Sequence, residues 1–169
     1  GCEIVSKQKF SYLAFSLYLA LLVWLVIFKL STSLSDLPQM RQLNLIPFAE
    51  PVIVNGRVVI SEIIANAVVF IPLGWYAVML CRQFRFLPRL FLGIILSLLF
   101  ETVQYIFAIG GSDITDILMN TLGTFLGIVT YMGLEKIFPN KAKPMVNGLV
   151  FSVCLAFLCL GVLLFIANQ

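Results

Sequence analysis

Long apolar runs alternate with short polar segments along the whole chain. Five such runs cover approximately 10–30, 61–81, 90–109, 113–134 and 145–167. A helix needs about 20 apolar residues to cross the hydrocarbon core of a bilayer, because it rises about 1.5 Å per residue. The pattern therefore predicts an all-α integral membrane protein with five transmembrane helices. We expect a membrane domain over 10–134 and an additional C-terminal transmembrane helix over 145–167.

Composition supports this fold class. Hydrophobic residues make up 61% of the chain and charged residues 11%. A soluble domain of 169 residues could hide so many apolar side chains only by burying nearly all of them. Little chain remains outside the apolar runs, so the predicted membrane helices must carry the function.

Basic residues predict the orientation of the helices, because lysine and arginine collect on the cytoplasmic side. One side of the membrane receives Lys7, Lys9, Arg82, Arg85, Arg89, Lys136, Lys141 and Lys143, and the other receives Lys29, Arg41 and Arg57. The distribution predicts an inside N-terminus and an outside C-terminus. The net charge of +3 then reflects topology and contact with anionic headgroups, and we expect no binding to nucleic acid.

The predicted outer loop, 31–60, is long enough to have structure of its own. Its second half has β-branched residues on both sides of Asn55-Gly56, which favours a short β-hairpin. Its first half contains Arg41, Asn44, Pro47 and Phe48. That segment is either a simple connector or a lid over polar groups in the helices below it.

Polar residues inside the predicted helices gather between Glu101 and Gly127. Each of two helices carries them on one arc of about 80° at 100° per residue. The first arc contains Gly93, Ser97, Glu101, Gln104 and Ala108, and the second contains Asp113, Asp116, Asn120, Gly123 and Gly127. Acidic side chains are expensive in hydrocarbon, so they usually face protein, water or a ligand. This stretch is therefore the candidate functional site.

The two arcs are expected to face each other, because a short Gly-Gly-Ser turn makes their helices antiparallel neighbours. Equal depth then pairs Ala108 with Asp113, Gln104 with Asp116, and Glu101 with Asn120. The prediction is a polar pocket that opens toward the outside. Gly123 and Gly127 are spaced to let two helix backbones approach closely, within the molecule or between copies of it.

The helix predicted over 61–81 contributes one more polar position. Glu62 and Asn66 are four residues apart and share a face, although Glu62 also suits a helix start. Pro72 removes a backbone hydrogen bond and predicts a kink near Gly74. No lysine or arginine lies in the central helices beside Glu101. Its partner is then a proton, Asn120, Asn66, a cation or Arg41 from the loop.

Several function classes remain open or are excluded at this stage. The chain has no histidine, which excludes Ser-His-Asp, Cys-His and His-zinc chemistry. Its four cysteines have no metal-ligand spacing. A purely structural role remains open, in which Asp113 and Asp116 cap a helix and Glu101 bonds between helices.

Two active alternatives also remain open. In the first, Glu101 and Asp116, with Asp113, hold Mg²⁺ or Mn²⁺ in an enzyme acting on lipid-linked phosphates. In the second, the protein is a lipid transporter or flippase, although the chain shows no internal repeat of the usual kind. We expect a binding or remodelling protein rather than an enzyme, with no cofactor.

Four separated motifs resemble the VanZ family in order and spacing. They are RQLNLIPF (41–48), NAVVFIPLG (66–74), FETVQ (100–104) and SDITDILMNTLGTFLG (112–127). The resemblance extends over about 11–131. The family's motif residues fall here on Arg41, Asn44, Pro47, Phe48, Asn66, Pro72, Gly74, Glu101, Gln104, Asp113, Asp116, Asn120 and Gly123. We expect ligand binding by Arg41, Asn44, Asn66, Glu101, Gln104, Asp113, Asp116 and Asn120. We expect structural roles for Pro47, Pro72, Gly74 and Gly123, and for Gly127 from its spacing. Many members carry an arginine before the first aspartate, where this chain has Gly110, Gly111 and Ser112.

The resemblance also implies a location and a biological role. The location would be the bacterial plasma membrane, which a small multi-pass protein spans. Its role would be low-level resistance to lipoglycopeptides such as teicoplanin, independent of the enzymes that rebuild the peptidoglycan terminus. The expected partners are membrane lipids, a lipid-linked peptidoglycan precursor or the lipoglycopeptide itself. The pattern leaves the oligomeric state open.

Overall fold

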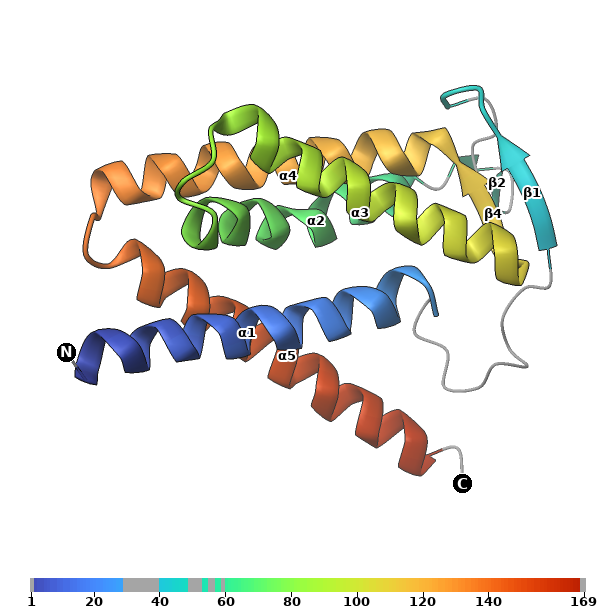
Figure 1. The fold of residues 1–169 in the computed structure, drawn as a ribbon. Coiled ribbons are helices and arrows are strands. Elements are labelled where there is room, and N and C mark those ends of the chain that lie inside the picture. Colours follow the sequence, from blue (N-terminus) through green and yellow to red (C-terminus); the bar gives the residue numbers. More distant parts are fainter. Residues whose placement is uncertain (1, 29–39, 49–52, 55–56, 59, 168–169) are drawn as a thin grey trace. The chain divides into compact units, whose positions relative to one another are not determined.

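Five long helices dominate the computed structural model, which describes residues 2–28, 40–48, 53–54, 57–58 and 60–167 (Figure 1). In chain order the helices are α1 (Cys2–Val26), α2 (Ile60–Leu80), α3 (Phe86–Phe107), α4 (Ile114–Ile137) and α5 (Ala142–Ala167). All five are long and apolar enough to cross a membrane. The predicted all-α membrane fold is confirmed. Lys29 and the Asn55-Gly56 turn lie outside the described residues.

Helix bounds differ from the predicted apolar runs by several residues at some ends. α1 begins at Cys2 rather than near residue 10, and its apolar part begins at Gln8. α3 begins at Phe86, four residues before the predicted run. Hydropathy marks the part of a helix that suits lipid, whereas polar ends continue the same backbone hydrogen bonding beyond it.

The chain forms two compact units, which are described separately. The first contains residues 1–36 and 134–169, and the second contains residues 37–133. In the first unit α1 packs on α5 through the rings of Phe10 and Phe151, whose centroids are 5.7 Å apart. Nδ2 of the buried Asn147 donates to Oγ of the buried Ser11 at 2.8 Å. Such a pair satisfies polar groups between helices that lipid could not satisfy.

The second unit is built on α2, α3 and α4. α3 and α4 run antiparallel, as the contact of Phe86 with Phe125 at one level and the bond between Ser97 and Asn120 at another show. Phe70 of α2 meets Phe100 of α3 edge-on, with ring centroids 6.2 Å apart. These aromatic contacts hold the three helices together around the residues that form the site.

α2 and α4 touch along a glycine seam, formed by Gly74, Gly123 and Gly127. A Cβ at Gly123 would collide with the carbonyl oxygen of Ala67, and one at Gly127 with that of Ile71. A Cβ at Gly74 would collide with the backbone of α4. The small residues therefore allow backbone-to-backbone contact within this chain, as the packing interpretation predicts. Gly123 and Gly127 of α4 face α2, however, and not α3.

Two small sheets accompany the helices. β2 (Ile53–Val54) pairs antiparallel with β3 (Arg57–Val58), which confirms the predicted hairpin pairing. β1 (Met40–Asn44) pairs parallel with β4 (Ile109–Asp113) at the end of α3 (Figure 1). The predicted Gly-Gly-Ser turn is wrong, because those residues form β4. Ala108 caps α3 in the left-handed conformation, with φ of 54°, and lets the chain reverse into β4.

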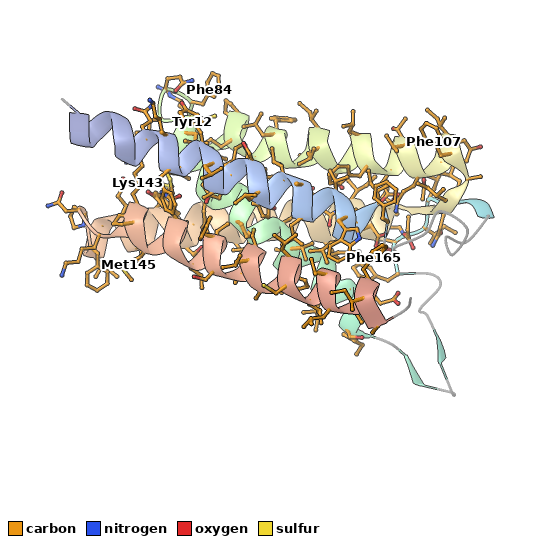
Figure 2. All side chains as sticks on the ribbon, turned by 90° about the horizontal axis from the view of Figure 1, so that it is seen from below. Tyr12, Phe84, Phe107, Lys143, Met145 and Phe165 are labelled. Atoms are coloured by element: carbon orange, nitrogen blue, oxygen red, sulfur yellow. The ribbon has the colours of Figure 1, made fainter. Side chains whose placement is uncertain are left out.

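Apolar side chains cover much of the outer surface of the helices. Tyr12, Phe107 and Phe165, labelled in Figure 2, are among the exposed large hydrophobic residues. Monomeric soluble proteins rarely expose so much contiguous apolar surface. This surface is what a bilayer would cover, and it agrees with the five apolar helices.

Candidate functional site

The site is organised on a link between Glu101 and Asp113. The Asp113 backbone N–H donates to Glu101 Oε2 at 3.1 Å, and the Ser112 hydroxyl donates to the Glu101 carbonyl oxygen at 2.9 Å. Glu101 is 6% exposed, so its carboxyl group is almost completely removed from solvent. β4 therefore lies against α3 at the level of Glu101, and it supplies donors that a membrane would not.

Asp113 connects three elements of the site. Its Oδ1 accepts the Thr115 N–H at 2.7 Å, which is the geometry of a side chain that caps the start of a helix. Its Oδ2 accepts a hydrogen bond from Nδ2 of Asn44 at 3.2 Å. Asn44 thus ties the end of β1 to the start of α4. The predicted capping role of Asp113 is present, and it coexists with the two contacts to β1 and α3.

A second contact holds the segment after β1 on α4. The Phe48 N–H donates to Oγ1 of Thr115 at 3.0 Å, and Thr115 is buried. Phe48 has a φ of 57°, a conformation that L residues rarely adopt without support. Pro47 precedes it and is exposed. Within the first half of the predicted outer loop, the described residues 40–48 therefore form a strand and turn anchored to the site.

Asp116 is joined to α2. Its Oδ1 accepts a hydrogen bond from Nδ2 of Asn66 at 2.6 Å. The predicted pairing of Asp116 with Gln104 stays a prediction. Asp116 also interacts electrostatically with Glu101. Three carboxyl groups of the second unit thus lie near one another, each with an amide or backbone donor.

Asn120 lies deeper than predicted. Its Nδ2 donates to Oγ of Ser97 at 2.8 Å, and both residues are buried. Its Oδ1 has no hydrogen-bond partner within the described part of the chain. The predicted pairing of Glu101 with Asn120 is wrong by one helical turn. The reason is β4, whose five residues extend about 3.3 Å each and shift α4 along α3 relative to a tight turn.

Gln104 and Arg41 complete the set of predicted site residues. Gln104 is 4% exposed and lies against Gly110, whose added Cβ would be 3.6 Å from Gln104 Nε2. Arg41 pairs with Gly110 through the backbone of β1 and β4, but its side chain lies outside the described part. A Cβ at position 110 would thus be in ordinary contact with the Gln104 amide. Whether Arg41 meets Glu101 stays a prediction.

A pocket opens beside this polar cluster, and we call it the polar pocket. Its volume is about 390 Å³. It is lined by Leu43, Asn44, Leu45, Leu98, Glu101, Thr102, Tyr105, Ser112, Asp113, Ile114 and Ile117. The polar members lie at the end where β1 and β4 meet α3. Leu98 and Ile117 lie about one turn further along α3 and α4.

The pocket opens on an apolar face of the helices. Leu98 is 47% exposed and Tyr105 is 40% exposed, and both line it. On a membrane helix such residues face lipid. A molecule with a polar head and an apolar chain would therefore match both ends of the pocket.

Sequence reasoning missed some residues of the site. Thr102 and Tyr105 lie beside the predicted arc on α3, and both are exposed. Nothing in the sequence pattern singled them out. Leu43 and Leu45 come to the pocket only because β1 pairs with β4. Thr115 looked like an ordinary first-turn residue. Ser97 was on the predicted arc, and its spacing from Glu101 was a usable signal.

Pro72 and the glycines of the seam are the residues predicted to shape the packing of α2 and α4. Pro72 lies inside α2, which is one helix from Ile60 to Leu80, and the predicted kink stays a prediction. Gly74, Gly123 and Gly127 form the glycine seam. The seam fixes α4 against α2, and so it sets the level at which Asp116 meets Asn66.

A metal ion finds no assembled site in the described part of the chain. Among those residues, no group of three or more cysteine, aspartate or glutamate side chains is arranged to hold one. Glu101 and Asp113 are joined through a backbone N–H rather than through both carboxyl groups. Whether Glu101 and Asp116 hold Mg²⁺ or Mn²⁺ between them stays a prediction.

Comparisons with known proteins are consistent with the motifs. The family model described as VanZ/LLP1 matches residues 15–138, which include α2, α3, β4 and α4. Protein VanZ of Enterococcus faecium is 41% identical to this chain over 130 residues, or 76% of this chain and 76% of that protein. No solved structure matches the chain. α5 lies beyond the matched range.

Proposed function

Because the chain belongs to the VanZ/LLP1 family, we propose that it contributes to low-level resistance to teicoplanin and related lipoglycopeptides. It does so by binding an amphiphile of the cell envelope in the polar pocket. The amphiphile is a membrane lipid, a lipid-linked peptidoglycan precursor or the antibiotic. The five membrane helices and the family make this a multi-pass membrane protein, and we propose the plasma membrane as its location.

The polar pocket is the observation that carries this proposal. Glu101 and Asp113 lie at its polar end, whereas Leu98 and Ile117 lie further into the helices. Ligand pockets have volumes of about 300–1,000 Å³, so about 390 Å³ suits a headgroup with the first part of a chain. It does not suit a whole glycopeptide. If the antibiotic is the ligand, only one part of it enters.

The predicted orientation places the pocket in the outer leaflet, where such ligands are met. α3 and α4 meet β1 and β4 at the end predicted to be outside. We propose that β1 and its following turn are the part of the wall that responds to the ligand. Beyond the pairing of β1 with β4, one hydrogen bond joins Asn44 to Asp113 at the end of β4, and one joins Phe48 to Thr115 of α4.

The two active alternatives receive less support. A divalent-metal-dependent enzyme needs side chains that converge on one ion, and no group of three or more acidic or cysteine side chains in the described part of the chain is arranged to hold one. A transporter needs a polar path across the membrane. Below Asn120 the contact face of α4 consists of Gly123, Thr124 and Gly127 packed on α2 and α3. We therefore propose a binding role rather than catalysis or transport.

Resistance measured in cells tests the proposal directly. A susceptible bacterium expresses the protein, Glu101→Gln, Asn44→Ala or Glu62→Gln, with protein levels checked by immunoblot. Glu62 is an exposed acid on α2 that does not line the pocket, so it is the matched control. We expect Glu101→Gln and Asn44→Ala to lower the minimum inhibitory concentration of teicoplanin toward that of cells without the gene. Full resistance in both pocket variants, at normal protein level, would remove the pocket from the function.

A further inference from the structure

We propose that the polar pocket selects an amphiphile whose head group is a protonated amine, rather than one with a phosphate head. This inference rests on the proposed function and names the ligand class of the same site. The argument depends on which hydrogen-bonding groups the pocket offers and which it lacks.

The described pocket wall offers mainly acceptors. Its two charged side chains among the described residues, Glu101 and Asp113, are both acidic. An ionised carboxylate offers about four acceptor positions. The Glu101 carboxyl group accepts from the Asp113 N–H and interacts with the Ser112 side chain, and the Asp113 carboxyl group accepts two hydrogen bonds, so about half of the roughly eight positions of the two groups are used. Acceptor capacity is therefore left over at the polar end of the pocket.

Three donor side chains on the same wall are already engaged. The Ser112 hydroxyl donates to the Glu101 carbonyl oxygen, and the Asn44 amide donates to Asp113. The Thr102 hydroxyl donates to the carbonyl oxygen of Leu98 at 2.7 Å. A phosphate head group would bring further acceptors and negative charge to a wall that already has both. An ammonium group brings three donors and a positive charge.

A second acceptor lies deeper in the same unit, outside the lining of the polar pocket. Oδ1 of Asn120 has no hydrogen-bond partner within the described part of the chain, although the residue is 1% exposed. The partner of its amide nitrogen, Ser97, precedes the pocket-lining Leu98. Exchanging the amide oxygen and nitrogen would leave one amide atom without a partner in the same way. A buried amide oxygen without a donor is rare, because burying it unpaired is unfavourable.

The apolar end of the pocket explains why the amine must carry a chain. Leu98 of α3 and Ile117 of α4 line it, and Leu43 and Leu45 lie on the β1 side. An ammonium ion alone would gain nothing from these side chains. A chain along α3 and α4 would cover them and continue into the surrounding lipid.

Binding of three probes with one chain and different heads tests the inference. Hexadecylamine, hexadecanol and hexadecyl phosphate are added to the purified protein in detergent micelles, and bound molecules are counted by native mass spectrometry. We expect hexadecylamine to bind at least about tenfold more tightly than either other probe, a difference of about 1.4 kcal/mol. Glu101→Gln should remove most of that preference, and Glu62→Gln should keep it. Asp113→Asn, which keeps a helix-capping side chain, gives a second variant if Glu101→Gln does not fold.

Two results of the experiment with the three probes would overturn the inference. The first is equal or tighter binding of hexadecyl phosphate, and the second is an unchanged amine preference in both Glu101→Gln and Asp113→Asn. Resistance that depends on Glu101, together with no amine preference, would leave the proposed function intact and remove only the ligand class. A preference for the amine probe, together with resistance that does not depend on the pocket residues, would keep the ligand class and remove the proposed function.

Two further binding experiments distinguish a membrane lipid from the antibiotic as the source of the amine. Nanodiscs with lysyl-phosphatidylglycerol are compared with nanodiscs that contain phosphatidylglycerol alone, which tests a membrane lipid. Teicoplanin is compared before and after acetylation of its amines, which tests the antibiotic. Stronger binding of the amine form in one experiment assigns the source, and no difference in either experiment contradicts the inference.

Discussion

The backbone N–H of Asp113 donates to Oε2 of Glu101 at 3.1 Å, so the residue that caps α4 is tied to a side chain buried inside α3. This contact gives Glu101 a structural role as well as a place on the pocket wall. A backbone donor is a partner that a prediction from side-chain arcs alone cannot supply. It also explains how an acidic residue remains in an apolar helix without a basic neighbour.

Replacement of Glu101 should separate its two roles. In Glu101→Gln the side-chain oxygen can still accept the Asp113 N–H, and we expect a change in stability below about 1 kcal/mol. Glu101→Ala leaves that N–H without a partner, and a loss of about 2 kcal/mol is expected. Thermal unfolding in detergent micelles measures both. Equal loss in the two variants would mean that the contact does not hold β4 on α3.

Exchange of Asn66 and Asp116 should test their pairing across α2 and α4. Asn66→Asp places a second carboxyl group against Oδ1 of Asp116, which Asn66 now contacts at 2.6 Å. We expect it to destabilise the protein by about 1–3 kcal/mol through repulsion and a lost donor. The double variant Asn66→Asp, Asp116→Asn restores one donor and one acceptor. It should recover at least half of the loss, and no recovery would contradict the pairing.

Asn120 and Ser97 should respond in opposite ways to apolar replacement. Ser97→Ala leaves the buried Asn120 amide nitrogen without its acceptor, and a loss of about 1–3 kcal/mol is expected. Asn120→Leu removes an amide whose oxygen has no partner, so stability should stay within about 1 kcal/mol or rise. A double-mutant cycle of Asn120→Leu with Ser97→Ala then gives a coupling energy of about 1 kcal/mol or more. Additive effects would show that the two side chains do not interact.

Long-range pairing explains what the sequence could and could not predict. The five helices follow from apolar runs, which act locally, and the buried arc of Ser97, Glu101 and Gln104 follows from helical periodicity. Residues 109–113 contain Gly-Gly, which usually disfavours a strand. They become β4 because β1, more than sixty residues earlier, pairs with them. Nothing within 109–113 indicates that partner.

The partners of the polar residues were harder to predict than their faces. Asp116, Gly123 and Gly127 share an arc with Asn120, but they meet α2 while Asn120 meets α3. One arc on a helix between two neighbours can serve both. The level of each contact depends on β4, whose extended backbone covers more length than a tight turn. A prediction that treated 110–112 as a turn therefore placed Asn120 opposite Glu101, one helical turn from its observed partner Ser97.

Alanine at Gly123 should damage the glycine seam, and Gly133 supplies a control on the same helix. An added Cβ at Gly123 would collide with the carbonyl oxygen of Ala67, whereas none of the described atoms lies within 4 Å of a Cβ at Gly133. We expect Gly123→Ala to lower stability by about 1–3 kcal/mol. Gly133→Ala should raise it by up to about 1 kcal/mol, because alanine suits a helix better. Similar midpoints for the two variants in micelles would show that the seam tolerates a methyl group.

Replacement of Ala108 by glycine should stabilise the protein. It ends α3 with φ of 54° and ψ of 35°, and its N–H donates to the carbonyl oxygens of Gln104 and Tyr105. An L residue in this conformation is strained by about 1–2 kcal/mol, because Cβ approaches the following carbonyl oxygen. Glycine lacks Cβ but has more freedom in the unfolded chain, so Ala108→Gly should stabilise the protein by about 0.5–1 kcal/mol. Glycine at Phe107, one residue earlier and still helical, is the control and should destabilise. A lower unfolding midpoint for Ala108→Gly than for the unchanged protein would contradict the left-handed cap and the reversal into β4.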